Sequence, residues 1–464
     1  MSAFTYASQF ATAGAHYPGE LSLQKVDSDW VDRLMNPRMD GAAYQDLKFA
    51  LHRKLLGRVN IEAVLALPDD RVRLEIRAAL AKLLEEENAP LNAFEQERIL
   101  DEVINEVFGL GPLEPLLQDP TVSDILVTNP KLVYVERRGK LQRTPVEFKD
   151  AAHMIRIIEK IVSRVGRRID ESSPMVDARL PDGSRVNAVI PPVAVDGPML
   201  SIRRFGKIPL QSDDLVRSLT WSDGMAELLQ ACVASRLNIV VSGGTGAGKT
   251  TILNVLSSFI PETERIVTIE DAAELRLQQT HTARMETRPA NVEGNGAIHI
   301  RQLVINALRM RPDRIIVGEV RGEEALDMMQ AMNTGHDGSL TTIHANNPRD
   351  GLSRLEVMMG MASANMSIHS IRQQITSAVD VFVHVARFSD GSRRVTHVTE
   401  CVGMEADTIT TQDIFLFERK GVLANGRVTG TFRATGIRPK FYEALKTAGH
   451  NLPGSLFQTV VEIG

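Results

Sequence analysis

The sequence predicts an α/β protein whose largest domain is built on a parallel β-sheet. Two observations support this prediction. From about residue 215 to residue 387, apolar strand-like runs alternate with helical patterns, and a glycine-rich segment, GGTGAGKT at residues 243–250, joins one such run to a helix. Strands that alternate with helices form parallel sheets, because each helix returns the chain to the same edge. A smaller α+β domain and an N-terminal helical bundle are expected to precede this domain.

Periodicity and composition divide the chain into five expected segments. They are a mobile lead segment at residues 1–43, a helical bundle at 44–110, an α+β domain at 111–205, a linker at 206–214, and the parallel-sheet domain with a C-terminal α/β extension at 215–464. The bundle is predicted from leucines that return at helical spacing, and the α+β domain from short alternating strands around one helix. The end of the chain, after about residue 390, is expected to contain short strands and one helix.

The composition limits the kinds of partner that are expected. The 464 residues carry a net charge of -5 and only 5% aromatic side chains, so no nucleic-acid partner is expected. The two cysteines, Cys232 and Cys401, form no CxxC pair, and no uninterrupted apolar run reaches the ~18 residues of a membrane span. We therefore expect a soluble, cytoplasmic protein that meets a membrane only through partners.

A complete phosphate-binding loop is the strongest functional signal in the sequence. Its members are Gly243, Gly244, Thr245, Gly246, Ala247, Gly248, Lys249 and Thr250, followed in the helix by Thr251. The glycines let backbone N–H groups turn inward around phosphate oxygens, and the helix adds the positive end of its dipole. Lys249 can then reach the β- and γ-phosphates, and the Thr250 hydroxyl can bind Mg²⁺. The loop predicts a site for a nucleoside triphosphate.

Acidic residues follow two later strand-like runs. One run ends in Glu270, with Glu274 shortly after it, and the next ends in Glu319. Residues at the carboxyl ends of parallel strands face the crevice that holds the ligand, so these side chains are expected to converge on the phosphates. Hydrolysis needs one carboxylate to orient the attacking water and another near the metal ion. A solvated carboxylate on a surface turn is the alternative for each.

Two histidines, His336 and His344, lie in the segment TGHDGSLTTIHANN at residues 334–347. His344 ends a short β-branched strand, so it is expected at the same edge as the phosphate-binding loop. No cysteine or third histidine lies near enough in sequence to complete a zinc site. A phosphate-sensing or interface role is favoured over a buried structural histidine.

The order of these motifs resembles the type II/IV secretion ATPase superfamily of hexameric RecA-like motors. The motifs are the phosphate-binding loop, TIEDAAEL at 268–275 (the acidic box), IIVGE at 315–319 and GHDGSLTTIHA at 335–345. Further stretches are similar to the CpaF/TadA group of tight-adherence (Flp-type) pilus ATPases. They are GPLEPLLQDPTVSDILV at 111–127, GRRIDESSPMVDARLPDGSRVNAVIPP at 166–192 and LSIRRF at 200–205. The spacing of His336 and His344 is also similar to the type IV secretion and tight-adherence branch.

The resemblance implies an ATP hydrolase with a RecA-like P-loop domain behind a PAS-like α+β domain. It implies a homohexamer that uses ATP and Mg²⁺ to power assembly or retraction of a tight-adherence type IV pilus through inner-membrane platform proteins. Three alternatives stay open: a type IV secretion ATPase that powers substrate transport, a RecA-like nucleic-acid motor, and a nucleotide-gated scaffold without turnover.

The resemblance also implies roles for the acidic and histidine residues. Glu319 would polarise the attacking water, and Glu274 would serve as the acidic-box carboxylate at the metal ion, with Glu270 beside it. His336 and His344 would link the γ-phosphate region to the subunit interface. Gly318 departs from the usual pattern, because most P-loop ATPases carry an aspartate at that position. The division of roles among Glu270, Glu274 and Glu319 therefore stays open.

Four arginines of the smaller domain are further candidates: Arg179, Arg185, Arg203 and Arg204. In the family such residues close over the nucleotide and act on the charge of the transition state. Side chains alternate along a strand, so Arg203 and Arg204 are expected on opposite faces and only one of them on phosphate. A solvated surface charge is the alternative for each arginine.

Overall fold

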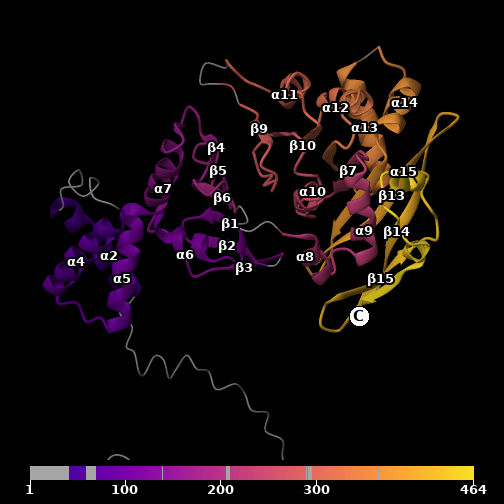
Figure 1. The fold of residues 1–464 in the computed structure, drawn as a ribbon. Helices are drawn as coiled ribbons and strands as arrows, with labels where there is room; N and C mark the ends of the chain where they lie inside the picture. Colours follow the sequence, from indigo (N-terminus) through magenta and orange to yellow (C-terminus); the bar gives the residue numbers. More distant parts are fainter. Residues whose placement is uncertain are drawn as a thin grey trace, which may run out of the picture. The chain divides into compact units, whose positions relative to one another are not determined.

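A computed structural model gives the fold of the chain (Figure 1). The residues that it describes are 41–58, 69–137, 139–204, 210–288, 290, 295–363 and 365–463. The chain divides between Glu114 and Pro115 into two compact units. Residues 1–40 of the expected lead segment lie outside the described residues, whereas residues 41–43 already belong to a helix, α2.

The described part of the first unit is a bundle of helices. They are α2 (Gly41–Arg58), α4 (Asp69–Glu87), α5 (Ala93–Phe108) and the short 3₁₀ turn η1 (Gly111–Leu113). Helix α5 begins with a reciprocal cap, since Asn92 accepts a hydrogen bond from Glu95 N (2.9 Å) and Glu95 accepts one from Asn92 N (3.2 Å). Leu51, Leu80 and Ile99, one from each long helix, are fully buried against one another. The apolar spacing of the sequence therefore becomes the core of this bundle.

The second unit begins within α6 (Glu114–Gln118) and continues with an antiparallel sheet and one long helix, α7 (Ala151–Ser163). The strands are β1 (Val122–Asn129), β2 (Leu132–Arg137), β3 (Lys140–Arg143), β4 (Met175–Arg179), β5 (Arg185–Val189) and β6 (Met199–Arg203). Their order is β3-β2-β1-β6-β5-β4. The apolar side of α7, with Met154, Ile158 and Ile161, is fully buried. Residues 206–209 of the expected linker lie outside the described residues, and its end is helical, in α8 (Ser212–Arg217).

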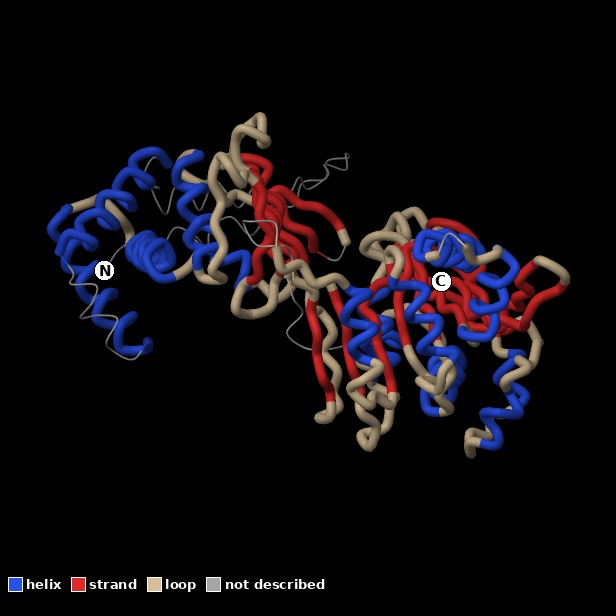
Figure 2. The backbone as a smooth tube through the Cα atoms, turned by 90° about the horizontal axis from the view of Figure 1, so that it is seen from above, coloured by secondary structure: helices blue, strands red, loops and turns tan. Residues whose placement is uncertain are grey.

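The rest of the second unit is built on one large sheet (Figure 2). Its first six strands are β7 (Ile239–Gly243), β8 (Ile266–Glu270), β9 (Thr282–Glu286), β10 (Arg314–Val320), β11 (Leu340–His344) and β12 (Val381–Arg387). They pair in parallel in the order β12-β7-β11-β10-β8-β9. The α/β class and the parallel sheet predicted from the sequence are confirmed.

Antiparallel strands extend this sheet beyond β12. They are β13 (Arg393–Glu405), β14 (Thr408–Val422), β15 (Val428–Ala434) and β16 (Val460–Ile463). The expectation of short strands after residue 390 is wrong for β13 and β14, which have 13 and 15 residues, whereas β15 and β16 are short and α15 is the expected helix. Register shifts at Cys401/Gly403 and at Arg419/Gly421 interrupt the alternation of side chains, so each long strand reads as shorter pieces in the sequence.

Helices cover both faces of the large sheet. They are α9 (Asp223–Ala234), α10 (Lys249–Ser257), α11 (Ile300–Ala307), α12 (Glu324–Asn333), α13 (Pro348–Ala362), α14 (Ile368–Ala378) and α15 (Tyr442–Thr447), with the 3₁₀ turn η2 (Gly454–Gln458). Ile239 and Val241 pack in one apolar core with α9 and α10, whereas Val240 packs in a second core with α11–α14. Neighbouring residues of a strand point to opposite faces, so the two cores lie on the two sides of the sheet. None of the described helices combines the length and apolarity needed to cross a bilayer.

Candidate functional site

The phosphate-binding loop connects the carboxyl end of β7 to the first turn of α10. Gly246 and Gly248 have φ angles of +68° and +102°, which side chains rarely allow, and these turns aim the loop around the start of α10. A Cβ atom on Gly243 would lie 2.3 Å from the Val385 carbonyl oxygen of β12. The loop can therefore follow β7 closely only with glycine at these positions.

The loop lysine meets two side chains from neighbouring strands. Lys249 Nζ donates to the Gly244 carbonyl (3.2 Å) and lies 3.3 Å from His344 Nε2. Glu319 Oε1 lies 2.9 Å from the same His344 nitrogen. Burial lowers the pKa of Lys249, and it also lowers the pKa of His344, to which the lysine charge adds. The structure thus brings Lys249, Glu319 and His344 together where β7, β10 and β11 end.

A β-bulge places Glu319 at this position. Val317 of β10 pairs with Thr341 of β11, but Val320 pairs with Ile343, so three steps along β10 match two along β11. Such bulges bend a strand and re-aim a side chain. The bulged carbonyl of Gly318 accepts a hydrogen bond from the buried hydroxyl of Thr342 at 2.8 Å. A threonine of the histidine segment therefore holds the backbone that carries Glu319.

Glu270 organises the acidic box. The Glu270 Oε1 atom accepts hydrogen bonds from Glu274 N (2.8 Å) and Leu275 N (2.9 Å), and the side chain is buried. Burial raises the pKa of Glu270 to about 7. A Cβ atom on Gly318 would lie 2.9 Å from Glu270 Cγ, which explains why this chain has glycine there. Glu274 itself is turned to Arg185, with 3.1 Å between Oε1 and Nη1.

Three of the four candidate arginines form a row on one face of the smaller sheet. Arg179 pairs across the strands with Arg185, and Arg185 with Arg203. Arg179 contacts Glu286 (3.0 Å), Arg185 contacts Glu274 (3.1 Å), and Arg203 contacts Asp124 (3.2 Å). Residues opposite each other in neighbouring strands share a face, so the row presents three cations together. Arg179 and Arg185 thus contact β9 and the acidic box, which both belong to the part of the chain built on the large sheet.

Two residues that the sequence predicts for the site, Arg204 and His336, lie away from Lys249, Glu319 and His344. Arg204 hydrogen-bonds through Nη1 to the backbone carbonyls of Asp119 and Val122, so it fixes its own domain and is withdrawn from the site. His336 precedes β11, whereas His344 ends it, and a strand of this length spans about 16 Å. His336 therefore lies at the opposite end of β11 from His344 and from the loop of its own chain, and its expected link to the subunit interface stays a prediction.

Two arginines that the sequence analysis did not select contact the site. Arg321 binds Glu319 Oε2 through Nη2 (2.7 Å) and Asp271 Oδ2 through Nη1 (2.9 Å). Arg393 donates from Nε to the Gly246 carbonyl of the loop at 2.9 Å. The position of Arg321 two residues after Glu319, directly beyond the end of β10, is a signal that could have identified it. Nothing in the sequence near Arg393 marks it.

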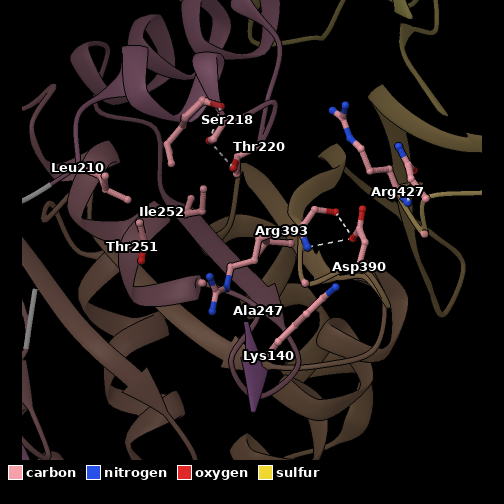
Figure 3. A pocket seen from close by; sticks show the side chains of 17 residues that line it. Lys140, Leu210, Ser218, Thr220, Ala247, Thr251, Ile252, Asp390, Arg393 and Arg427 are labelled. Atoms are coloured by element: carbon pink, nitrogen blue, oxygen red, sulfur yellow. Dashed lines mark hydrogen bonds between the residues drawn. The ribbon is translucent and has the colours of Figure 1, made fainter. Parts of the chain in front are cut away.

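A cavity of about 490 Å³ opens beside the loop (Figure 3). Ala247, Gly248, Thr251 and Ile252 form the side of the cavity made by the loop and α10. The opposite wall mixes apolar, hydroxyl and charged side chains, including Leu215, Ser218, Thr220, Asp390, Arg393 and Arg427. Ser218 and Thr220 hydrogen-bond to each other at 3.0 Å, as Figure 3 shows. The cavity is large enough for a nucleoside and touches the loop on its helix side.

The oxygen ligands at the loop fit a magnesium ion held together with phosphate. Among the described residues, no group of three or more His, Cys, Asp or Glu side chains is placed to hold a metal ion without other ligands. Magnesium does not need such a group, because in phosphoryl-transfer sites it takes one or two protein ligands and completes its shell with water and phosphate. The Thr250 hydroxyl and the strand-end carboxylates supply ligands of that kind.

Comparison with known proteins places this geometry in a family. Residues 106–427, most of the chain, match the family model described as "Type II/IV secretion system protein". A putative conjugal transfer protein of Mycobacterium tuberculosis is 40% identical over 299 residues, covering 63% of this chain and 84% of that protein. The conjugal transfer protein TrbB of Rhizobium radiobacter is 34% identical over 292 residues, covering 62% of this chain and 86% of that protein.

Among solved structures, the VirB11 ATPase of the Brucella suis type IV secretion system aligns over 65% of this chain and 96% of that chain, at 28% identity and a TM-score of 0.34. The extent of the family match is decisive, since it includes the loop, the acidic box, Glu319 and His344. The chain belongs to the type II/IV secretion system family and is an ATP-hydrolysing enzyme of that family.

Proposed function

We propose that ATP is hydrolysed at the junction of the phosphate-binding loop with β10 and β11. The arrangement of Lys249, His344 and Glu319 carries this proposal, with His344 Nε2 3.3 Å from the lysine and 2.9 Å from the carboxylate. Phosphate oxygens would replace the Gly244 carbonyl as the partner of Lys249 and neutralise its charge. A water held by Glu319 would then attack the γ-phosphorus in line and pass its proton to the carboxylate, while the bond from that phosphorus to the β–γ bridging oxygen breaks and ADP leaves.

The remaining side chains have supporting roles in this proposal. Thr250 and Glu274 would hold Mg²⁺, which when bound neutralises charge on the phosphates. Glu270 would keep the acidic box in shape through its two backbone hydrogen bonds. His344, neutral by burial, would accept or donate a hydrogen bond as the γ-phosphate arrives and leaves.

The nucleoside is proposed to occupy the cavity beside α10. The phosphates would lie along the loop to Thr250, and Thr251, Ile252 and Leu215 line the cavity beside it. Apolar side chains can stack on the base, while Ser218 and Thr220 offer hydroxyl groups to its edge. The lining of the cavity and the phosphate-binding loop beside it together favour ATP as the ligand.

We propose that the enzyme works as a homohexamer whose smaller domain closes over the nucleotide. Arg179 and Arg185 already contact the acidic-box side, and Arg203 lies in the same row. Different affinities of ATP and ADP for open and closed arrangements would convert hydrolysis into motion. Light scattering with a saturating ATP analogue tests the hexamer, and a monomer mass would refute it.

We propose that ATP hydrolysis powers a tight-adherence pilus, from the cytoplasmic face and through inner-membrane platform proteins. The segments 111–127, 166–192 and 200–205, which are similar to the CpaF/TadA group, support this choice. Substrate transport by a type IV secretion or conjugal system is the second candidate, and it is favoured by the similarity to two conjugal transfer proteins. Site-specific cross-linking in membranes separates them, because capture of a pilus platform protein supports the first and capture of a secretion-channel protein supports the second.

The hydrolytic proposal has a direct test. Phosphate release by the wild-type protein is compared with that of Glu319→Gln at saturating Mg·ATP. Loss of turnover with retained ATP binding is expected. Equal rates in the two proteins would remove Glu319 from the mechanism, and several-fold stimulation by added DNA would support a nucleic-acid motor instead.

A further inference from the structure

Arg321 joins the strand end that carries Glu319 to the loop that carries the acidic box. Its two terminal nitrogens bind different carboxylates, Glu319 at 2.7 Å and Asp271 at 2.9 Å. Asp271 lies 50 positions earlier in the chain, directly after β8, so the guanidinium bridges two neighbouring strand ends. A planar guanidinium fixes the direction of both partners, which a flexible lysine does not.

The backbone of Arg321 is fixed independently of its side chain. Glu324 Oε1 accepts hydrogen bonds from Arg321 N (2.7 Å) and Gly322 N (3.0 Å) at the start of α12. The hydrogen bond to Glu319 raises the pKa of Arg321 above its usual value, so the guanidinium stays charged. The Arg321 guanidinium is therefore a charged group on a backbone that hydrogen bonds fix in place. Most surface ion pairs, in contrast, join two mobile side chains.

The two carboxylate oxygens of Glu319 have different neighbours. Its Oε2 atom binds Arg321, and its Oε1 atom faces His344 Nε2 at 2.9 Å. The side chain is 17% exposed, whereas that of Arg321 is 53% exposed and lines the cavity of about 740 Å³ on the acidic-box side. The carboxylate thus has one oxygen turned to the phosphate site and one tied to Arg321.

We propose that Arg321 is a positioning residue that holds the Glu319 carboxylate in the orientation required for hydrolysis. This inference rests on the proposed role of Glu319 and extends it to a residue outside the motifs. Without the guanidinium, Glu319 can rotate away from the phosphate and Asp271 loses its link to β10. Misplacement of a reacting group by about 1 Å can lower a rate by about 100-fold.

A second arginine of the chain provides a matched control for the two ion pairs of Arg321. Arg301 also joins two carboxylates, Glu323 at 2.7 Å and Asp327 at 2.9 Å, and its side chain is 37% exposed. It lies on α11 and contacts none of the site residues named above. Arg301→Gln therefore removes a similar pair of surface ion pairs without touching Glu319.

The first experiment compares steady-state phosphate release in the full-length wild type, Arg321→Gln and Arg301→Gln. Arg321→Gln is expected to lower kcat by about 10- to 100-fold, with KM for Mg·ATP within about 2-fold of wild type. Arg301→Gln is expected to match wild type. An unchanged kcat in Arg321→Gln would overturn the proposal, and a raised KM with unchanged kcat would show that Arg321 binds ATP.

Rescue and double-variant experiments exclude a merely structural effect. Guanidinium ion at low millimolar concentration is expected to restore turnover several-fold in Arg321→Ala but not in Glu319→Gln. The double variant E319Q/R321Q is expected to be no slower than Glu319→Gln, since Arg321 acts through that carboxylate. Additive losses would contradict the proposal. If Glu319→Gln itself turns over like wild type, the proposed function fails; if only Arg321→Gln does, this inference alone fails.

Discussion

Buried Glu270 predicts a pH-dependent stability that a single substitution removes. The side chain is 3% exposed, and burial raises its pKa from 4.5 to about 7. Between these values the native protein keeps a proton that the unfolded chain has released, so unfolding is favoured as pH rises. The stabilisation is complete below about pH 4.5 and is lost as pH rises through about 7.

The size of the effect follows from the shift in pKa. A shift of about 2.5 units corresponds to about 3 kcal/mol, at 1.36 kcal/mol per unit. Glu270→Gln keeps an oxygen for the hydrogen bonds from Glu274 N and Leu275 N but carries no charge. The free energy of unfolding of wild type, relative to Glu270→Gln, should therefore fall by about 3 kcal/mol between pH 4.5 and 8.

Urea unfolding without nucleotide or metal ion measures this difference. Trp221 is fully buried in the large core and is one of only two tryptophans, so a Trp30→Phe background leaves it as the reporter. Asp380, whose pKa burial raises to about 6, is present in both proteins. Its contribution to the pH dependence of the free energy of unfolding therefore cancels in the comparison. A difference that stays constant from pH 4.5 to 8 would show that Glu270 does not keep its proton in the native protein.

Two further predictions concern the groups that hold the backbone of the site. Thr342→Val leaves the Gly318 carbonyl without its 2.8 Å hydrogen bond, so we expect a loss of about 1–3 kcal/mol in urea unfolding and a lower kcat. Thr431→Val is its control, because the buried Thr431 hydroxyl has no hydrogen-bond partner among the described residues, and equal losses in both variants would contradict the account. Arg393→Gln removes the 2.9 Å hydrogen bond to the loop, so the Kd of a fluorescent ATP analogue should rise about 3- to 10-fold. Arg433→Gln, an exposed arginine paired with a glutamate on a neighbouring strand, should bind like wild type; an unchanged Kd in Arg393→Gln would remove Arg393 from the site.

The sequence was most informative where a function depends on consecutive residues. The phosphate-binding loop needs glycines at fixed spacing between a strand and a helix, so its motif also gives its geometry. Glu319 and His344 could be placed because each ends a strand of a parallel sheet, and such ends meet at one edge. That argument does not extend to His336, because it precedes β11 and the length of the strand separates it from His344.

Other features depend on contacts that sequence spacing does not encode. Arg321 reaches Asp271 across 50 positions, and Arg393 reaches the loop across 147 positions. The bulge that aims Glu319 leaves no mark in the apolar pattern of β10. Alternation did separate Arg203 from Arg204, but the carbonyl partners of Arg204 were visible only in the fold.

The central claim, that Glu319 beside the phosphate-binding loop carries out hydrolysis, is tested most directly by Glu319→Gln in a single-turnover experiment. ATP binding should stay within about 3-fold of wild type, while phosphate release should fall by about 10²- to 10⁴-fold. Glu323→Gln, an exposed carboxylate four positions away at the start of α12, should retain wild-type rates. Equal rates of phosphate release in Glu319→Gln and wild type would contradict the account.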